Sequence, residues 1–370
     1  MTRLLVLALG AALVGVGCEE KKTSETPRAE AGASPDKYAT ADPKLEKALK
    51  AVAAASSSPD NGPPPSGIFA PGAADHRHAR GVPTKVDFLE SGAEPLVALS
   101  PAGDSSAEGA RPATYGPAAL QSVIQMGPRV VIGVDYGLLL GPAKKDEGGA
   151  EWLVADVKRA MPSKALGPPP AGTDKDISSL EGTQIRVKLT ADGREIDLVT
   201  RLATAAKSDL DRLAQSAAEA LVLSTVPLPP KPVGVGAQWI AETRMPMSGL
   251  DVIVYRAYRV KSVERDKVHL TLDAKAYAAN NDVQLAGVPP GATLAQFEAT
   301  CRGELDIVRG EALARKAEIQ EHAVLVFAAP GGDKAADKSG QPPTNMLTAQ
   351  LQSQAMFLRG EELRAAARQQ

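Results

Sequence analysis

The feature that most constrains the fold is a regular alternation of apolar and polar residues along several segments. The clearest example runs from Phe297 to Ile307. Successive side chains of a strand point to opposite faces, so this pattern predicts a strand with one buried and one wet face. The buried face would carry Phe297, Ala299, Cys301, Gly303, Leu305 and Ile307. Such strands are typical of antiparallel sheets, because strands of parallel sheets are usually buried on both faces.

Turn sequences connect pairs of these alternating segments. Asp192-Gly193 lies between two alternating runs in residues 184–204, and both residue types tolerate the positive φ angles of tight hairpins. Val252–Val263 and Val268–Tyr277 flank a charged four-residue turn. Arg309-Gly310-Glu311 is expected to turn the chain into a partner strand. The sequence therefore predicts three hairpins in these regions.

Other segments carry shorter strand patterns. Val86 and Phe88 are separated from Val97 and Leu99 by Glu90-Ser91-Gly92-Ala93, which predicts a further hairpin. Alternation also runs over residues 347–357, where a C-terminal helix is the alternative. The remaining candidate strands are 121–126, 130–140 and 152–161.

One amphipathic helix interrupts the strands. Ser208 and Asp211 resemble a capping box, and an apolar stripe runs along the helix at helical spacing. The stripe consists of Leu210, Leu213, Ala214, Ala217 and Leu221. We expect this helix to pack on the inner face of the sheet. Irregular loops rich in Gly, Pro and Asp are expected at 141–150, 163–180 and 329–344.

The composition agrees with a β-rich fold, because 33 glycines and 29 prolines are too many for a helical bundle. The predicted class is mainly β: an antiparallel curved sheet or incomplete barrel with one or two packed helices (β-rich α+β), preceded by a disordered tether. This domain would cover residues 81–362, as one unit or as two sequential lobes at 81–205 and 206–362.

The N-terminus has the organisation of a secretory signal peptide, which we assign to residues 1–17. Arg3 supplies a positive charge, and the apolar run Leu4–Gly17 follows it. Fourteen helical residues span about 21 Å, which is less than the ~30 Å hydrocarbon core of a bilayer. A stable transmembrane helix is therefore not expected here.

Small residues directly before a cysteine, Val16-Gly17-Cys18, resemble the lipobox of bacterial lipoproteins. In that family the signal is cut before the cysteine, which then carries diacylglycerol and usually an amide-linked acyl chain such as palmitate. Gly15 departs from the family pattern, which has an aliphatic residue at that position. The resemblance implies that Cys18 anchors the chain in a membrane of the bacterial cell envelope, with the inner or outer membrane left open. A cleaved signal with an incidental cysteine is the alternative.

Residues 18–80 read as a flexible tether. They are poor in large apolar residues and rich in Pro, Ser, Ala and charge, as in the stretch from Ser56 to Gly67. One helix candidate begins at Asp42-Pro43 and places Leu45, Leu49 and Val52 on one face. This helix would either dock on the domain or a partner, or be marginal in isolation.

The charge balance and the aromatic content exclude some partners. A formal net charge of -2 and an aromatic content of 4% argue against nucleic-acid binding, which needs a positive field and often stacking platforms. No Gly-x-Ser-x-Gly, His-Glu-x-x-His, Walker or Cys-x-x-Cys motif occurs. Asp135 and Asp251 offer carboxylates, but no spacing pairs them as an acid–base couple. We therefore expect no catalytic residues and no cofactor.

The histidines and Cys301 are the residues that could ligate a metal or act as a nucleophile. His76-Arg77-His78 could be half of a metal site, but nothing in the sequence places His269 and His322 beside it, so a solvated end of the tether is preferred. Cys301 could be a nucleophile only with a lowered pKa and a nearby base. Its place on the apolar face of a strand instead predicts a buried, inert thiol. With Cys18 acylated, no intrachain disulfide remains.

Residues 232–239, Pro-Val-Gly-Val-Gly-Ala-Gln-Trp, contain a Gly-x-Gly without the strand and helix of a dinucleotide site. The pattern Pro-Val-x-Val-Gly-x-x-Trp resembles a stretch in bacterial envelope lipoproteins of GC-rich genomes that have no assigned activity. That resemblance implies that Gly236 makes an entry turn and that Trp239 starts a strand on the core face.

Three functional hypotheses follow. The preferred one is a lipid-anchored, non-catalytic envelope lipoprotein that binds an envelope protein partner or has a structural role. The second is a periplasmic carrier of lipid or another apolar ligand in a half-barrel. A hydrolase is the residual hypothesis. Whether the concave face of the sheet is hollow or filled would separate the first two.

Overall fold

The computed structural model describes residues 75–80, 84–99, 116–126, 130–142, 151–163, 173–189, 192–203, 208–247, 250–279, 293–328 and 346–369. Several predicted features lie outside the described residues: the signal, Cys18, and residues 19–74 of the tether with the helix candidate after Asp42. Most of the loops expected at 141–150 and 329–344 also lie outside them.

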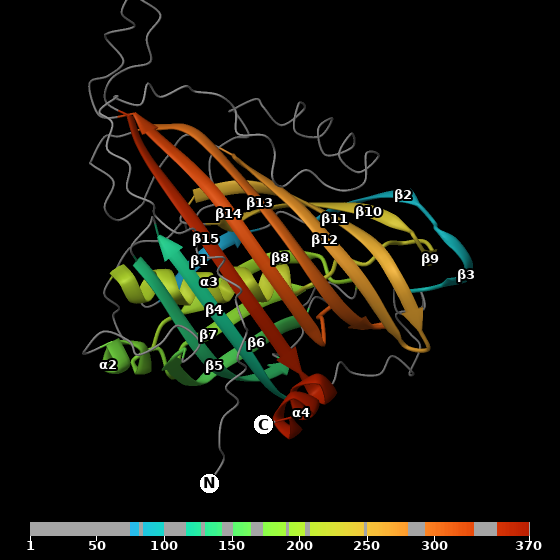
Figure 1. The fold of residues 1–370 in the computed structure, drawn as a ribbon, viewed down its shortest axis with the longest axis horizontal. Coiled ribbons are helices and arrows are strands. Elements are labelled where there is room, and N and C mark those ends of the chain that lie inside the picture. Colours follow the sequence, from blue (N-terminus) through green and yellow to red (C-terminus); the bar gives the residue numbers. More distant parts are fainter. Residues whose placement is uncertain are drawn as a thin grey trace, which may run out of the picture.

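The fold is mainly β, as the alternation predicted (Figure 1). The strands are β1 (Asp75–Arg80), β2 (Lys85–Glu90), β3 (Ala93–Val97), β4 (Pro117–Met126), β5 (Val130–Pro142), β6 (Glu151–Pro162), β7 (Gln184–Leu189), β8 (Glu195–Arg201), β9 (Val233–Val235), β10 (Gln238–Met247), β11 (Leu250–Glu264), β12 (Lys267–Ala278), β13 (Thr293–Val308), β14 (Lys316–Ala328) and β15 (Met346–Arg359). The helices are α2 (Thr173–Ser178), α3 (Ser208–Leu223) and α4 (Gly360–Arg368).

Thirteen strands form one antiparallel sheet in the order β1-β8-β7-β6-β5-β4-β15-β14-β13-β12-β11-β10-β2, and β3 and β9 form a separate small sheet. The sheet curves so that its two halves face each other across α3 (Figure 1). Strands β4 to β8 and β10 to β15 turn buried apolar residues toward one shared core, which the curved sheet encloses. The halves 81–205 and 206–362 contribute to this one sheet and are joined where β4 pairs with β15.

A single stretch of chain supplies both edges of the sheet. β1 pairs with β8 at one edge, and β2, which begins five residues after β1 ends, pairs with β10 at the other. The Thr84 and Thr243 hydroxyls are hydrogen-bonded at 2.9 Å, and β1 also contacts β10. β1 and β2 therefore act as an edge clasp that brings the two ends of the open sheet together.

Most predicted elements are confirmed. The predicted hairpins are β7–β8, β11–β12 and β13–β14. On β13 the buried residues include Phe297, Ala299, Cys301, Leu305 and Ile307, as the alternation predicted. The helix expected after Ser208 is α3. Residues 346–359 form β15, and the helical alternative holds only for the following segment, α4.

Three expectations were wrong in detail. The hairpin around Glu90-Ser91-Gly92-Ala93 does not form, because β2 pairs with β10 and β3 leaves the sheet to pair with β9. Gly92 (φ 76°) makes this departure feasible, since a Cβ there would lie 2.5 Å from the Ala237 nitrogen. Asp75–Arg80, assigned to the tether, forms β1, and the loop expected at 163–180 contains the short helix α2.

Within the ranges that the structure describes, no helix combines the length and the apolar character needed to cross a membrane. α4 contacts β15 and β4 and has no buried residue.

Candidate functional site

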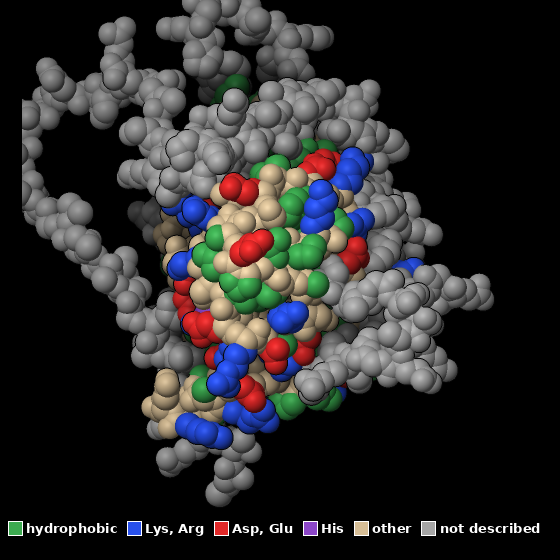
Figure 2. All heavy atoms as spheres, turned by 90° about the vertical axis from the view of Figure 1, so that its right-hand side faces the viewer, with side chains coloured by type: hydrophobic (Ala, Val, Ile, Leu, Met, Phe, Trp, Pro, Cys, Tyr) green, Lys and Arg blue, Asp and Glu red, His purple; other side chains and the backbone are tan. Residues whose placement is uncertain are grey.

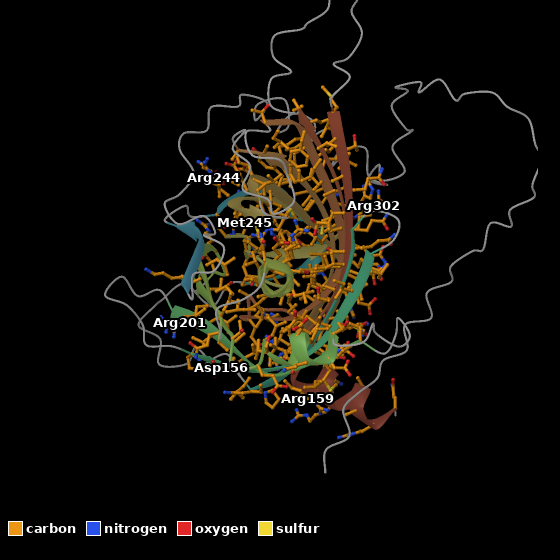
Figure 3. The ribbon with its side chains drawn as sticks, turned by 90° about the vertical axis from the view of Figure 1, so that its left-hand side faces the viewer. Asp156, Arg159, Arg201, Arg244, Met245 and Arg302 are labelled. Atoms are coloured by element: carbon orange, nitrogen blue, oxygen red, sulfur yellow. The ribbon has the colours of Figure 1, made fainter. Side chains whose placement is uncertain are left out.

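The concave face of the sheet is the place where the carrier hypothesis would put a ligand. α3 lies inside this curve, and the view along the helix shows side chains around it (Figure 3). Ala214, Ala217, Ala218 and Leu221 of α3 are each at most 2% exposed. They belong to one core cluster with inward residues of β4 to β8 and β10 to β15. The helix and these side chains therefore occupy the concave face.

Polar contacts fix the position of α3 inside the sheet. The Tyr136 hydroxyl on β5 donates to the Leu213 carbonyl at 3.1 Å, and the hydroxyls of Ser122 on β4 and Ser216 are 2.7 Å apart. Tyr136 is 2% exposed, and burial raises the pKa of its phenol well above the ordinary value. These side chains hold the first half of α3 against β4 and β5.

A buried arginine holds the other end of α3. Arg256 on β11 is fully buried and donates Nη1 to the carbonyls of Val222 (3.2 Å) and Thr225 (3.0 Å). Its Nη2 donates to the Thr243 hydroxyl at 2.8 Å. The last carbonyls of a helix lack intrahelical donors and carry a partial negative charge, which a guanidinium satisfies. Arg256 was not predicted as a site residue from the sequence, although it is the one charged position on the inner face of Val252–Val263.

In residues 232–239, Gly236 makes a turn and Trp239 begins a strand on the core face, as expected from the sequence. Gly236 has φ 88°, and Trp239 at the start of β10 is fully buried. The Trp239 indole donates to the Pro227 carbonyl at 2.9 Å and stacks on Tyr258 with 5.3 Å between ring centroids. These contacts connect the chain after α3 to the core face of β10 and β11.

Cys301 lies on the inner face of β13 and is 3% exposed. Burial raises the pKa of its thiol well above the ordinary value, nearby Glu321 adds to the increase, and Arg256 opposes it. A nucleophilic cysteine needs the opposite shift. The prediction of a buried cysteine is confirmed, and its geometry does not fit a nucleophile.

The two carboxylates considered from the sequence lie on different parts of the sheet. Asp135 on β5 accepts a hydrogen bond from Gln121 at 2.8 Å. Asp251 on β11 is 5% exposed and forms a bidentate ion pair with Arg244 of β10, at 2.6 Å and 3.1 Å. Each carboxylate thus holds neighbouring strands together, and the two do not form one site.

The histidines are also separated. His76 and His78 lie on β1, whereas the imidazole of His269 forms a close contact with Asp306 on the outer face, and His322 lies on β14. Among the residues with a described position, no three His, Cys, Asp or Glu side chains gather as metal ligands would. Cys18, the predicted lipidation residue, lies outside the described residues.

A second buried arginine, also missed from the sequence, organises the end of β15. Arg359 is 2% exposed and donates Nε to the Ala314 carbonyl at 2.8 Å and Nη2 to Glu311 at 2.7 Å. Arg315 contacts the other oxygen of Glu311 at 2.5 Å. This cluster fixes the turn between β13 and β14 against the start of α4.

Comparisons with models of protein families, with curated protein sequences and with solved structures gave no match to this chain.

Proposed function

We propose that the protein is a lipid-anchored, non-catalytic lipoprotein of the bacterial cell envelope that binds a partner protein through its outer surface. The observation that carries the proposal is the apolar run that ends at Val16-Gly17-Cys18, which supplies an export signal and an acylation site. The folded domain begins at β1, more than fifty residues later, so the tether leaves it free to reach a partner away from the membrane.

The filled concave face supports binding at the outer surface. Exposed apolar side chains gather at the end of the molecule that carries β2, β3 and β9 (Figure 2). They include Leu89, Leu96 and Val235, which are 44%, 42% and 49% exposed. Exposed apolar groups of this kind favour contact with another protein.

The anchor is tested by replacing the acylated residue. Cys18→Ser should release the protein from the membrane fraction of the expressing bacterium, because no thiol remains to accept diacylglycerol. Cys301→Ala, which removes the other cysteine, should leave the protein in the membrane fraction. A Cys18→Ser protein that stays fully membrane-bound with an uncut signal would refute the lipoprotein assignment.

The binding role is tested by crosslinking in cells. A specific crosslinked partner should be recovered with the wild-type chain and lost with Leu96→Ser. Leu139→Ser is the matched control, because Leu139 is also 42% exposed but lies on β5. Recovery of no reproducible partner, or equal recovery with both variants, would argue against this surface.

A carrier of lipid or another apolar ligand is the second candidate. Because α3 occupies the apolar concave face of the sheet, a ligand would have to displace this helix. Native mass spectrometry of the protein purified from the envelope should then show a co-purifying lipid. A ligand-free mass would count against a carrier and leave the anchor proposal intact.

A further inference from the structure

A hollow lined by polar side chains lies on the outer face of the sheet, over β13, β14 and β15. Six lining residues form two neighbouring rows across these strands: Thr300, His322 and Gln352 in one row, and Arg302, Gln320 and Gln354 in the next. In Figure 3 the labelled Arg302 points away from the interior. The long antiparallel register thus brings hydrogen-bonding groups from three strands to one place.

Several of these side chains form no hydrogen bond with another described residue. In the part of the chain with described positions, the side chains of Thr300, Gln320, Gln352 and Gln354 make no hydrogen bond to another described residue. Each amide offers two N–H donors and each hydroxyl offers one. A ligand in the hollow would therefore meet donors from several directions.

One acidic group that lines the hollow is turned inward, and the one beside Arg302 is paired with it. Glu321, the carboxylate that lines the hollow, is 6% exposed and accepts a hydrogen bond from Ser353 at 2.9 Å. Asp273 on β12 lies beside Arg302, with 3.4 Å between Oδ1 and Nε. The outward lining side chains are thus three amides, the Thr300 hydroxyl and the His322 imidazole, beside the Arg302 guanidinium.

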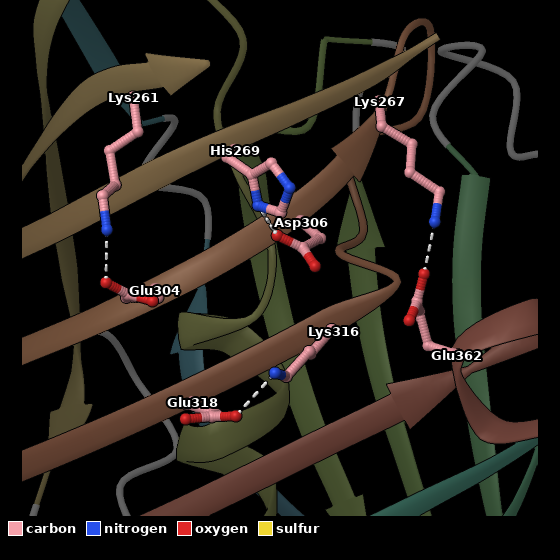
Figure 4. Close-up of polar contacts among 8 residues, drawn as sticks. All are labelled: Lys261, Lys267, His269, Glu304, Asp306, Lys316, Glu318 and Glu362. Carbon is pink, nitrogen blue, oxygen red and sulfur yellow. Dashed lines mark hydrogen bonds and ion pairs between the residues drawn. The ribbon is translucent and has the colours of Figure 1, made fainter. Parts of the chain in front are cut away.

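The neighbouring part of the outer face is different, because its charges are matched in pairs (Figure 4). Lys261 contacts Glu304 at 2.7 Å, Lys316 contacts Glu318 at 2.7 Å, and Lys267 contacts Glu362 at 2.6 Å. His269 contacts Asp306 in the same region. The donor-rich hollow lies next to this ion-paired band and is distinguished from it by its unpaired amides.

We propose that the hollow binds a small oxyanion, that is, a carboxylate or phosphate group of a ligand. Arg302 would be the charged contact, and the amides of Gln320, Gln352 and Gln354 would donate further hydrogen bonds. Hydrogen bonds between a guanidinium and an oxyanion are charge-assisted, and the planar fork of arginine matches the geometry of both groups. This inference does not depend on the membrane anchor or on the apolar end of the molecule.

Isothermal titration of the full-length chain with sodium phosphate and with sodium acetate, at constant ionic strength, tests the proposal. We expect saturable binding of at least one anion and none of glucose. Arg302→Gln should weaken binding by about tenfold, the change expected for loss of one charge-assisted contact. Arg364→Gln, the same charge change on exposed α4, should leave binding unchanged.

A second variant distinguishes the loss of a ligand contact from the loss of the ion pair between Arg302 and Asp273, which Arg302→Gln also removes. Gln354→Ala keeps the pair between Arg302 and Asp273 and should weaken binding severalfold. Binding of phosphate alone or of acetate alone would support the proposal and identify the group. The proposal is wrong if neither anion saturates, if Arg302→Gln binds as well as wild type, or if glucose binds as tightly as the anions.

Discussion

The guanidinium of Arg256 lies 3.0 Å from the carbonyl oxygen of Thr225, just beyond the last turn of the enclosed helix α3. A fully buried cation on the inner face of β11 thus ends the helix that fills the core. This contact connects β11 of the curved sheet to the C-terminal end of α3.

Replacement of Arg256 should destabilise the domain strongly. Arg256→Met keeps an apolar stem but removes the guanidinium, so the Val222 carbonyl keeps only the Thr225 N–H and the Thr225 carbonyl only the Tyr258 hydroxyl. We expect a loss of about 3 kcal/mol in the free energy of unfolding. Urea unfolding followed by tryptophan fluorescence measures this change. Arg259→Met, three residues along the same strand and exposed, should change stability by less than about 0.5 kcal/mol. Equal effects of the two variants would contradict the buried role of Arg256.

Tyr136 should make the free energy of unfolding depend on pH in the alkaline range. The folded state holds the phenolic proton more tightly than the unfolded state, whose pKa is near 10.0, so stability falls as the pH rises above that value. Tyr136→Phe should cost about 1 kcal/mol at pH 8 through loss of the bond to Leu213. The same variant should lose less stability than wild type between pH 9 and about 11.5. Parallel pH profiles for the two proteins would contradict this linkage.

Cys301 should be unreactive in the folded protein. In the Cys18→Ser chain it is the one remaining thiol. Because burial and Glu321 both raise its pKa, Ellman's reagent at pH 8 should detect no thiol under native conditions and one thiol in guanidinium chloride. Rapid labelling of the native protein would show that the inner face of β13 is accessible, as a carrier requires.

Two glycines provide a matched test of the small sheet. A Cβ on Gly234 would lie 1.7 Å from the Ala93 carbonyl oxygen, whereas a Cβ on Gly141 meets nothing within 4 Å. Gly234→Ala should therefore separate β3 from β9 and cost about 2 kcal/mol, because backbone cannot move aside as a flexible side chain can. Gly141→Ala should stay within about 0.5 kcal/mol of wild type in thermal or urea unfolding. A neutral Gly234→Ala would show that the two strands are not held closely.

Local sequence patterns predicted most of the strands and helices correctly. The errors concern strands whose pairing depends on residues far away in the sequence. The alternation on β12 and β13 identified the correct inward faces because both strands have one buried side. It could not identify β1, whose sequence Asp-His-Arg-His-Ala-Arg lacks alternation and whose pairing with β8 depends on the backbone. Likewise, the departure of β3 toward β9 depends on residues more than a hundred positions away.

The candidate sites were predictable to a smaller extent. The sequence correctly placed Cys301 and Trp239 in the core, since each lies in a recognisable apolar pattern. It did not identify Arg256 and Arg359, because a buried charge depends on backbone carbonyls that only the folded chain brings together. The hollow around Arg302 was missed for a related reason: its two rows of side chains exist only once three strands are in register.

The edge clasp formed by β1 and β2 has a consequence for a chain that a protease has cut between them. Open sheet edges recruit other strands, and here both edges are supplied by consecutive residues at the boundary between tether and domain. A protease that cut between Arg80 and Lys85 would sever β1 from the rest of the domain and leave β8 free to pair with another molecule. Once β1 dissociates from β8, proteolysis at this one point would turn the domain into a seed for strand-mediated aggregation.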